Sequence, residues 1–400
     1  MDFMAFRLQE CKNCKRFAPI EEFFQRKTSR ASIVIYYVFD FWPVYSYNII
    51  MNIQQKLDSL LRKGVEQGCF PGAVAACGCR GEVSAISWAG KISLDGPLTD
   101  RHTRYDMASL TKILCPTMIA LRAIEDGDLT LYDTLETHFP NVPDDKRSIT
   151  IRQLMSHSAG FEPAFWLSEE TESPDDALAA LFAHPLAYAP GEDVRYSCMG
   201  YITLGKLLEK LYEQPLNHLA EEKVFRPLNM THTGYLPEGG NIAATEVDSA
   251  TGKAWQGIVH DENARFLRGV SANAGIFSCI DDMILFAQML ANGADGYLAP
   301  ATLSKAIRCH AENGDIRRGL GFHLAGTPFN FMGDLFPECS FGHTGFTGTS
   351  LAVDPTTGFY LILLSNRVHP TRENLRLVRF RRTLHNAMYA EFSRERMSDK

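Results

Sequence analysis

The stretch Ser109-Leu110-Thr111-Lys112 begins a segment in which apolar side chains recur at helical spacing. The recurring residues are Ile113, Leu114, Ile119, Leu121 and Ile124. This spacing predicts a helix whose first turn places Ser109 and Lys112 on one face. The Lys112 amine then lies within about 3 Å of the Ser109 hydroxyl, the reach that a general base needs. A four-residue pattern is short, and the alternative that Ser109 is only a helix N-cap stays open.

Apolar segments near both ends of the chain have the composition of β-strands. They are residues 73–77, 83–88, 350–353 and 359–364. The last two are joined by Asp354-Pro355-Thr356-Thr357-Gly358, which predicts a hairpin turn. Helical periodicity dominates the region between the two pairs. We therefore expect an α/β (α+β) fold in which both chain ends build one sheet and a helical region, about residues 105–290, is inserted.

Helices are also predicted at the two edges of this body. One starts near Met51 and ends at Gly68, and the other spans Thr371–Phe392. In the second helix we expect three apolar residues to face inward and four arginines to form a solvated stripe. The apolar residues are Leu375, Val378 and Leu384, and the arginines are Arg372, Arg376, Arg379 and Arg382. Pro116 predicts a kink in the helix that starts at Ser109.

Composition excludes several classes of protein. The chain of 400 residues is 45% hydrophobic and 22% charged, as in soluble globular proteins. Its 40 basic and 47 acidic side chains give a net charge of −7, which argues against a nucleic-acid partner. Ten cysteines are too few for a disulfide scaffold in a chain of this length, and a reducing compartment is the simpler interpretation. Cys11-x-x-Cys14 lacks a second ligand pair, so we expect no metal site.

Residues 1–50 differ from the rest of the chain. An apolar run starts at Ile33 and continues to Met51, but Asp40, Pro43, Ser46 and Asn48 interrupt it. We expect either a poorly ordered extension or a membrane anchor over residues 33–51, and any membrane contact only there. A cytoplasmic location is the first expectation and membrane anchoring the alternative. The folded body is expected over residues 51–395.

Two further segments carry residues suited to proton transfer or substrate binding. Tyr196-Ser197-Cys198 follows turn-forming residues and precedes a helix predicted over residues 201–208. A phenol held beside a lysine can accept and return a proton, although a lone tyrosine is more often a packed ring. His343-Thr344-Gly345 lies in a glycine-rich strand, where a ligand can approach the backbone closely. On an edge strand this segment would offer an unpaired N–H to a substrate carbonyl.

These three segments, in this order, resemble the serine β-lactamase and penicillin-binding-protein superfamily, in its class C β-lactamase-related branch. Ser109-x-x-Lys112 matches the family's Ser-x-x-Lys, Tyr196-x-Cys198 its Tyr-x-Asn, and His343-Thr344-Gly345 its Lys/His-Thr-Gly. Supporting matches are Leu154–Gly160, Tyr201–Gly205, Val259–Asn263, Gly345–Ser350, Asp354-Pro355 and Asn366–Pro370. The resemblance spans roughly residues 51–390 and implies a central antiparallel sheet flanked by helices.

The resemblance also implies a role for each matched residue. Ser109 would be the nucleophile that forms an acyl-enzyme, and Lys112 and Tyr196 would share the proton transfer, with the acylation base left open. The backbone N–H groups of Ser109 and Phe346 would form the oxyanion hole. His343, Thr344, Gly345 and Cys198 would contact the substrate. For the pair His260-Asp261, a structural loop role is at least as plausible as a functional one.

Two departures from the family pattern bear on substrate choice. Cys198 replaces an asparagine whose amide would bind the substrate's amide chain, and a thiol is a weak substitute. His343 replaces a lysine that would supply a fixed positive charge, because a histidine with a pKa near 6.5 is mostly neutral at pH 7. We therefore expect esterase or D-Ala carboxypeptidase chemistry in preference to efficient β-lactam hydrolysis.

The sequence predicts a serine hydrolase acting on an ester, a D-amino-acid peptide or a β-lactam-like amide. The alternative is a non-catalytic, ligand-binding or structural descendant of the same fold. The expected partner is a small-molecule or peptide substrate, with no cofactor and no metal. The oligomeric state is left open, because no feature of the sequence bears on it.

Overall fold

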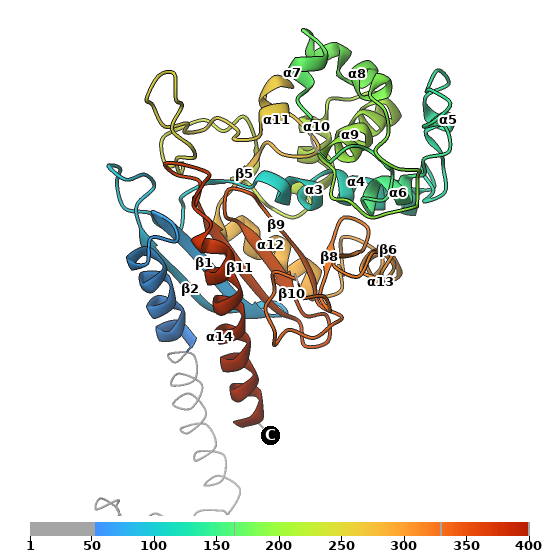
Figure 1. Ribbon diagram of the computed structural model, residues 1–400. Helices are drawn as coiled ribbons and strands as arrows, with labels where there is room; N and C mark the ends of the chain where they lie inside the picture. The colour runs from blue at the N-terminus through green and yellow to red at the C-terminus, as the bar shows by residue number, and fades with distance from the viewer. Residues whose placement is uncertain (1–52, 164, 329, 399–400) are drawn as a thin grey trace, which may run out of the picture. The chain divides into compact units, whose positions relative to one another are not determined.

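The computed structural model describes residues 53–163, 165–328 and 330–398 (Figure 1). Its centre is an eight-stranded antiparallel sheet in the order β2-β1-β11-β10-β9-β8-β7-β6. The strands are β1 Gly72–Cys79, β2 Glu82–Gly90, β6 Ala311–Glu312, β7 Arg317–Arg318, β8 His323–Leu324, β9 Phe341–Thr344, β10 Ser350–Val353 and β11 Phe359–Ser365. Strand β1 pairs with β11, so both ends of the chain build the sheet, as the sequence predicts.

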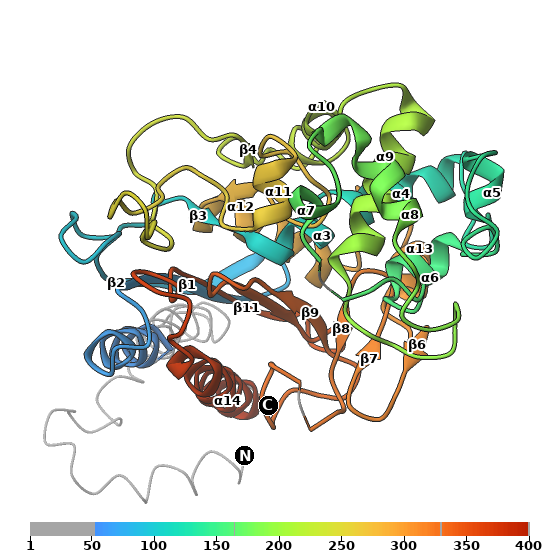
Figure 2. The same ribbon diagram turned by 45° about the horizontal axis from the view of Figure 1, so that its top comes forward.

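The sheet is covered on both faces, which explains the unbroken apolar run of β11. On one face lie α14, Arg376–Ser398, and a helix over residues 53–66; on the other lies α12, Ile280–Ala291 (Figure 2). Alternate residues of β11 point to opposite faces: Leu361 packs on the α14 side, and Ile362 belongs to the core that includes α12.

The inserted region is mainly helical and is joined to a small second sheet. Its helical segments are η2 Ala108–Leu110, α3 Thr111–Leu114, α4 Pro116–Asp126, α5 Leu135–His138, α6 Ile151–Met155, α7 Leu167–Glu170, η3 Pro174–Asp176, α8 Ala177–Ala183, α9 Cys198–Tyr212, α10 Leu216–Ala220, η4 Glu221–Phe225 and α11 Glu262–Phe266; α13 Pro300–Ala306 follows α12. The second sheet has the order β3-β5-β4, with β3 Tyr105–Asp106, β4 Gly234–Tyr235 and β5 Ile276–Ser278. Strand β3 leads directly into the turn that carries Ser109.

The helix predicted from Ser109 is real but broken. Ser109 lies in the short 3₁₀ segment η2, and α3 ends at Leu114. Cys115 then leaves the helical region, with φ −129° and ψ −85°, and Pro116 is the first residue of α4. The predicted kink is thus confirmed as a break, because proline is favoured at a helix start, where its missing N–H costs nothing.

The C-terminal helix differs from the prediction in its start and in its buried face. It begins at Arg376 instead of Thr371. Leu375 and Val378 are 66% and 56% exposed, so the expectation that they face inward was wrong, whereas Leu384 is buried as predicted. The residues that pack on the sheet are Leu377, Phe380, Leu384, Met388 and Phe392. Their spacing of three to four residues fits one helical face once the helix starts later.

Some sequence predictions lie outside the described residues. The extension over residues 1–50, the membrane anchor over residues 33–51 and the pair Cys11 and Cys14 all belong to this group. Among the helices that the structure does describe, none combines the length and the hydropathy needed to cross a membrane. The eight cysteines within the described residues are free thiols.

Candidate active site

The turn that carries Ser109 is held by an unusual backbone and a buried carboxylate. Ala108, directly before Ser109, has φ +45°, a left-handed conformation that costs energy for a residue with a Cβ. Asp106 Oδ1 accepts a hydrogen bond of 2.7 Å from the Ala108 N–H, and the Met107 N–H donates to the Ile276 carbonyl at 2.8 Å. These bonds fix the orientation of the turn, so the Ser109 side chain faces a cavity described below.

Lys112 lies directly beneath Ser109 and is fully buried. Its amine donates to Ser109 Oγ at 3.1 Å, to the Asn273 carbonyl at 2.9 Å and to Cys198 Sγ at 3.5 Å. Burial by itself lowers the pKa of Lys112, but Cys198 and Tyr196 act in the opposite direction, and the net pKa is raised. The three contacts of the amine, with Ser109 Oγ, the Asn273 carbonyl and Cys198 Sγ, also match the three hydrogen bonds that a charged ammonium group can donate.

Tyr196 completes the group around Ser109. Helix α9 begins at Cys198, earlier than the predicted residue 201, and Ser197 caps it by accepting from the Met199 N–H. Tyr196 thus lies just before the helix, with its ring 4.5 Å from the His157 ring and 4.9 Å from the Lys112 amine. Burial raises the pKa of the Tyr196 phenol, while Lys112 and Ser109 oppose that rise. The phenol is therefore neutral at rest and placed beside a cation.

Strand β9 brings the third predicted segment to the same place. It is not an edge strand, since it pairs with β10 and with β8, but β8 pairs only with Phe341 and Gly342. His343 and Thr344 therefore extend past the end of β8, which leaves their other side open. A Cβ at Gly345 would overlap the Thr349 side chain and the Met107 carbonyl, so glycine is needed where this turn meets the Ser109 turn.

A cavity of about 390 Å³ opens above Ser109. Its lining residues are Ser109, Tyr196, Arg318, His323, Phe331, His343, Thr344, Gly345, Phe346, Arg367, Leu377, Val378 and Arg381. Six of the eight predicted site residues are in this lining. The other two, Lys112 and Cys198, lie behind Ser109, where Cys198 contacts the Lys112 amine instead of the cavity. Burial raises the pKa of the Cys198 thiol, so the thiol stays protonated.

His343 carries no positive charge at neutral pH, in agreement with the sequence prediction. Its pKa is well below the ordinary value because the ring is buried and faces the cations Arg318 and Lys112. His343 Nδ1 lies 2.8 Å from the Thr344 carbonyl, which requires a proton on Nδ1. Nε2 is then a bare acceptor, and it is buried without a hydrogen-bond partner among the described residues.

Three arginines in the cavity wall were missed by the sequence analysis. Arg318, Arg367 and Arg381 are at most 8% exposed, and within the described residues none forms an ion pair with a carboxylate. Arg318 is the extreme case, since its Nε is buried without a hydrogen-bond partner among the described residues and its guanidinium lies 5.3 Å from the Tyr196 ring centroid. Burial, together with Arg367, lowers the pKa of Arg381 to about 9. Their burial depends on the three separate segments, on β7, after β11 and on α14, that meet at this cavity.

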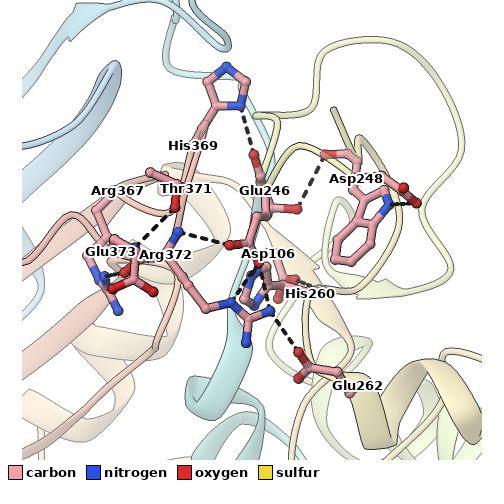
Figure 3. A network of polar contacts seen from close by, with 12 residues as sticks. Asp106, Glu246, Asp248, His260, Glu262, Arg367, His369, Thr371, Arg372 and Glu373 are labelled. Atoms are coloured by element: carbon pink, nitrogen blue, oxygen red, sulfur yellow. Dashed lines mark hydrogen bonds and ion pairs between the residues drawn. The ribbon is translucent and has the colours of Figure 1, made fainter. Parts of the chain in front are cut away.

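A polar network that includes Glu246, His260, Glu262 and Arg372 is shown in Figure 3. It reaches the cavity-lining residue Phe346 through the His260 ring, which stacks on the Phe346 ring. Glu246 accepts from Arg372 Nε at 2.7 Å and lies 3.0 Å from His260 Nε2, and Arg372 also binds Glu262 at 2.7 Å. Burial raises the pKa of Glu246, but the bonds from Arg372 and His260 outweigh it and lower the pKa to about 2. From the sequence, a structural loop role for His260 was at least as plausible as a functional one, and Glu246 was not predicted.

One group of side chains has the composition of a metal site. Ligand atoms of His232, Cys279 and Asp282 lie within 4.8 Å of one another, at the start of α12. Asp282 already accepts from the His232 N–H and the Thr233 hydroxyl, both at 2.7 Å. These bonds join the β4 segment to α12, which accounts for the buried carboxylate.

Comparisons with known proteins agree with this geometry. The family model described as Beta-lactamase matches residues 57–384. A relative in Escherichia coli strain K12, named as a D-alanyl-D-alanine carboxypeptidase, is 31% identical over 332 residues, covering 72% of this chain and 74% of its own. An N-acetylmuramyl-L-alanine amidase of Bacillus subtilis strain 168 is 27% identical over 369 residues, covering 79% and 81%.

Solved structures show the same fold. EstCE1, a hydrolase with promiscuous acyltransferase activity, superposes with a TM-score of 0.71 at 22% identity, covering 85% of this chain and 99% of its own. The octameric penicillin-binding protein homologue from Pyrococcus abyssi has a TM-score of 0.67 at 19% identity, covering 84% and 76%. Because the family model spans most of the described body, the chain belongs to the beta-lactamase family of serine hydrolases.

Proposed function

We propose that this protein hydrolyses an amide or ester bond through an acyl-serine intermediate on Ser109, in a substrate that carries a carboxylate near the bond. The observation that carries the proposal is the 3.1 Å contact between the Lys112 amine and Ser109 Oγ at the base of the cavity. A hydroxyl in this setting can lose its proton as it attacks a carbonyl carbon. Water would then release the acyl group and restore the serine.

Proton transfer is assigned to Lys112 and Tyr196 together. The Tyr196 phenol oxygen takes the proton that Ser109 loses while a proton passes from Tyr196 to the leaving group, so that Tyr196 ends the step neutral. The charged Lys112 amine stabilises the negative charge that develops on the Ser109 and Tyr196 oxygens during this transfer. The Phe346 N–H has no acceptor among the described residues, which suits a donor in an oxyanion hole. The Ser109 N–H is the second donor in this proposal.

The buried arginines support an anionic substrate. A buried guanidinium without a carboxylate partner is costly, so a substrate carboxylate that enters the cavity gains both Coulomb attraction and hydrogen bonds. Arg318 thereby supplies the fixed charge that His343 lacks. Peptides with a free carboxylate fit this cavity better than neutral esters do. The names of the curated relatives, a D-alanyl-D-alanine carboxypeptidase and a muramyl-L-alanine amidase, fall in the same peptide class.

The test combines active-site labelling with a small substrate panel. Wild type and Ser109→Ala are treated with a fluorophosphonate probe, and the labelled residue is located by peptide mass spectrometry. Both proteins are also assayed with D-Ala-D-Ala peptides, their C-terminal amides, short nitrophenyl esters and nitrocefin. We expect an adduct on Ser109, turnover highest for the free acid peptide, and no turnover by Ser109→Ala. Binding of the peptides without turnover by wild type would instead support a non-catalytic descendant.

A further inference from the structure

His260 connects the two turns that meet at the cavity. Its backbone N–H donates to Asp106 Oδ2 at 2.7 Å, and the other oxygen of Asp106 holds the Ala108 N–H. Its imidazole stacks on the ring of Phe346, with centroids 5.6 Å apart and planes inclined by 24°. One buried residue therefore contacts the support of the Ser109 turn through its backbone and the Phe346 turn through its side chain.

Glu246 fixes which way the His260 ring faces. Its carboxylate is ionised, so it can only accept the hydrogen bond of 3.0 Å at His260 Nε2, and the proton must lie on that nitrogen. Burial lowers the pKa of His260, which keeps the ring neutral and its tautomer single. Arg372 in turn holds Glu246 from its side chain and from its backbone N–H, at 2.7 and 3.0 Å.

The Phe346 ring has two close contacts, with Arg367 and with His260, although half of its surface is exposed. The Arg367 guanidinium lies 4.5 Å from the ring centroid, and His260 also stacks on the ring. The Thr347 hydroxyl, one residue on, donates to the Asp106 carbonyl at 2.7 Å. The direction of the Phe346 N–H thus depends on ring contacts outside its own short turn.

We propose that His260 is a positioning residue for the oxyanion hole, and that Glu246 and Arg372 hold it in the orientation that aims the Phe346 N–H at the substrate (Figure 3). The inference rests on the proposed function, since it assigns the Phe346 N–H to the acylation step. It makes the reaction rate depend on residues outside the group formed by Ser109, Lys112 and Tyr196. An oxyanion donor acts mainly in the transition state, so a misaimed donor lowers kcat and leaves KM nearly unchanged.

The experiment compares four variants of the full-length chain on a neutral nitrophenyl ester, which avoids the arginine contacts. His260→Ala removes the stacked ring, His260→Phe keeps a ring without the Nε2 proton, and Glu246→Gln weakens the anchor. Glu136→Gln is the matched control, because Glu136 is an exposed glutamate that pairs with Arg147 and has no contact with the His260 network within the described residues. Steady-state kinetics, the rate of fluorophosphonate labelling and the thermal midpoint are measured for each.

We expect kcat to fall about 100-fold in His260→Ala and about 10-fold in Glu246→Gln, the range for a small misplacement of a catalytic donor. KM should change less than about threefold, and His260→Phe, which keeps a ring but loses the bond to Glu246, should lose about 10-fold in kcat, as Glu246→Gln does. Glu136→Gln should stay close to wild type. Labelling rates should follow kcat.

Two results would overturn the inference. If His260→Ala keeps wild-type kcat while Ser109→Ala is inactive, the proposed function stands and His260 has no positioning role. If His260→Ala and His260→Phe lose activity equally, in proportion to a lowered thermal midpoint, His260 acts through stability alone. Retained activity in Ser109→Ala would instead contradict the proposed function, so the two failures are distinguishable.

Discussion

The two walls of the Ser109 cavity satisfy their buried charges in different ways. The helical wall comprises Tyr196, which lines the cavity, and the group behind Ser109 formed by Lys112, Cys198 and Asn273; its single cation, Lys112, has three hydrogen-bond partners within the protein. The sheet wall consists of β9 with residues 345–346 and the arginines Arg318, Arg367 and Arg381, whose cations lack carboxylate partners in the described part of the chain. The cation of the first wall is thus satisfied by the protein itself, and we propose that a substrate carboxylate satisfies those of the second. Under this proposal, chemistry and substrate choice are carried by separate parts of the fold.

The largest effect is expected on the helical wall. Lys112→Met keeps the length of the side chain and removes its amine, so kcat/KM should fall about 10³-fold for every substrate, acidic or neutral. Exposed Lys63→Met provides a matched control and should behave as wild type. Steady-state assays of both substrate kinds check this. A loss confined to acidic substrates would assign Lys112 to recognition and contradict the comparison.

A smaller and selective effect is expected on the sheet wall. Arg318→Met should lower kcat/KM about 10- to 100-fold for a peptide with a free carboxylate, the value of a hydrogen bond to a charged group, and change neutral esters little. Arg317 precedes it on β7 and is paired with Glu312, so Arg317→Met is the control. Equal losses of kcat/KM for acidic and neutral substrates would show that Arg318 does not discriminate between substrates by their charge.

The same substitution should also raise stability. Replacing an unpaired buried cation with an apolar side chain of similar size is neutral or favourable, so the thermal midpoint of Arg318→Met should rise by about 2–4 °C. Differential scanning calorimetry of the two β7 variants measures this. A lowered midpoint in Arg318→Met would mean that the guanidinium stabilises the free protein, and the sheet wall would then resemble the helical wall.

Outside the two walls, Glu246 offers a test through pH. Its pKa of about 2 in the folded protein lies below the unfolded value of about 4.3, so its ionised form stabilises the fold above pH 4.3 and this contribution is lost as the pH falls toward 2. Urea unfolding of wild type and Glu246→Gln should differ most near pH 7, by at most about 3 kcal/mol. The difference should shrink below pH 4.3. A pH-independent difference would contradict the assigned ionisation.

The smallest expected effect concerns the pH profile, in which we expect no histidine ionisation near neutral pH. His157 and His343 both have pKa values well below 6.5, because each is buried and faces Arg318 and Lys112. The profile of kcat/KM against pH should therefore show no histidine ionisation between pH 6 and pH 7. An acid limb in that range that disappears in His343→Gln would show that bulk water or a counter-ion reaches the sheet wall.

The contrast between the walls also explains what could be predicted from the sequence. Ser109 and Lys112 are neighbours on one helical turn, and β10 and β11 are joined by a strong turn, so local spacing predicts both. Tyr196 and His343 were found through a family pattern, because no local rule connects residues so far apart. The errors at Leu375 and Val378 arose because the helix start depends on packing against the sheet.

The sequence by itself determined the sheet built from both chain ends, the Ser109 and Lys112 pair and the neutral character of His343, because each follows from local periodicity or intrinsic chemistry. Only the tertiary structure decided that Lys112 stays charged, that Arg318 is buried without a carboxylate partner in the described region, and that Glu246 and His260 stand behind Phe346. Burial and pairing are properties of distant segments brought together, so they exist only once the chain has folded.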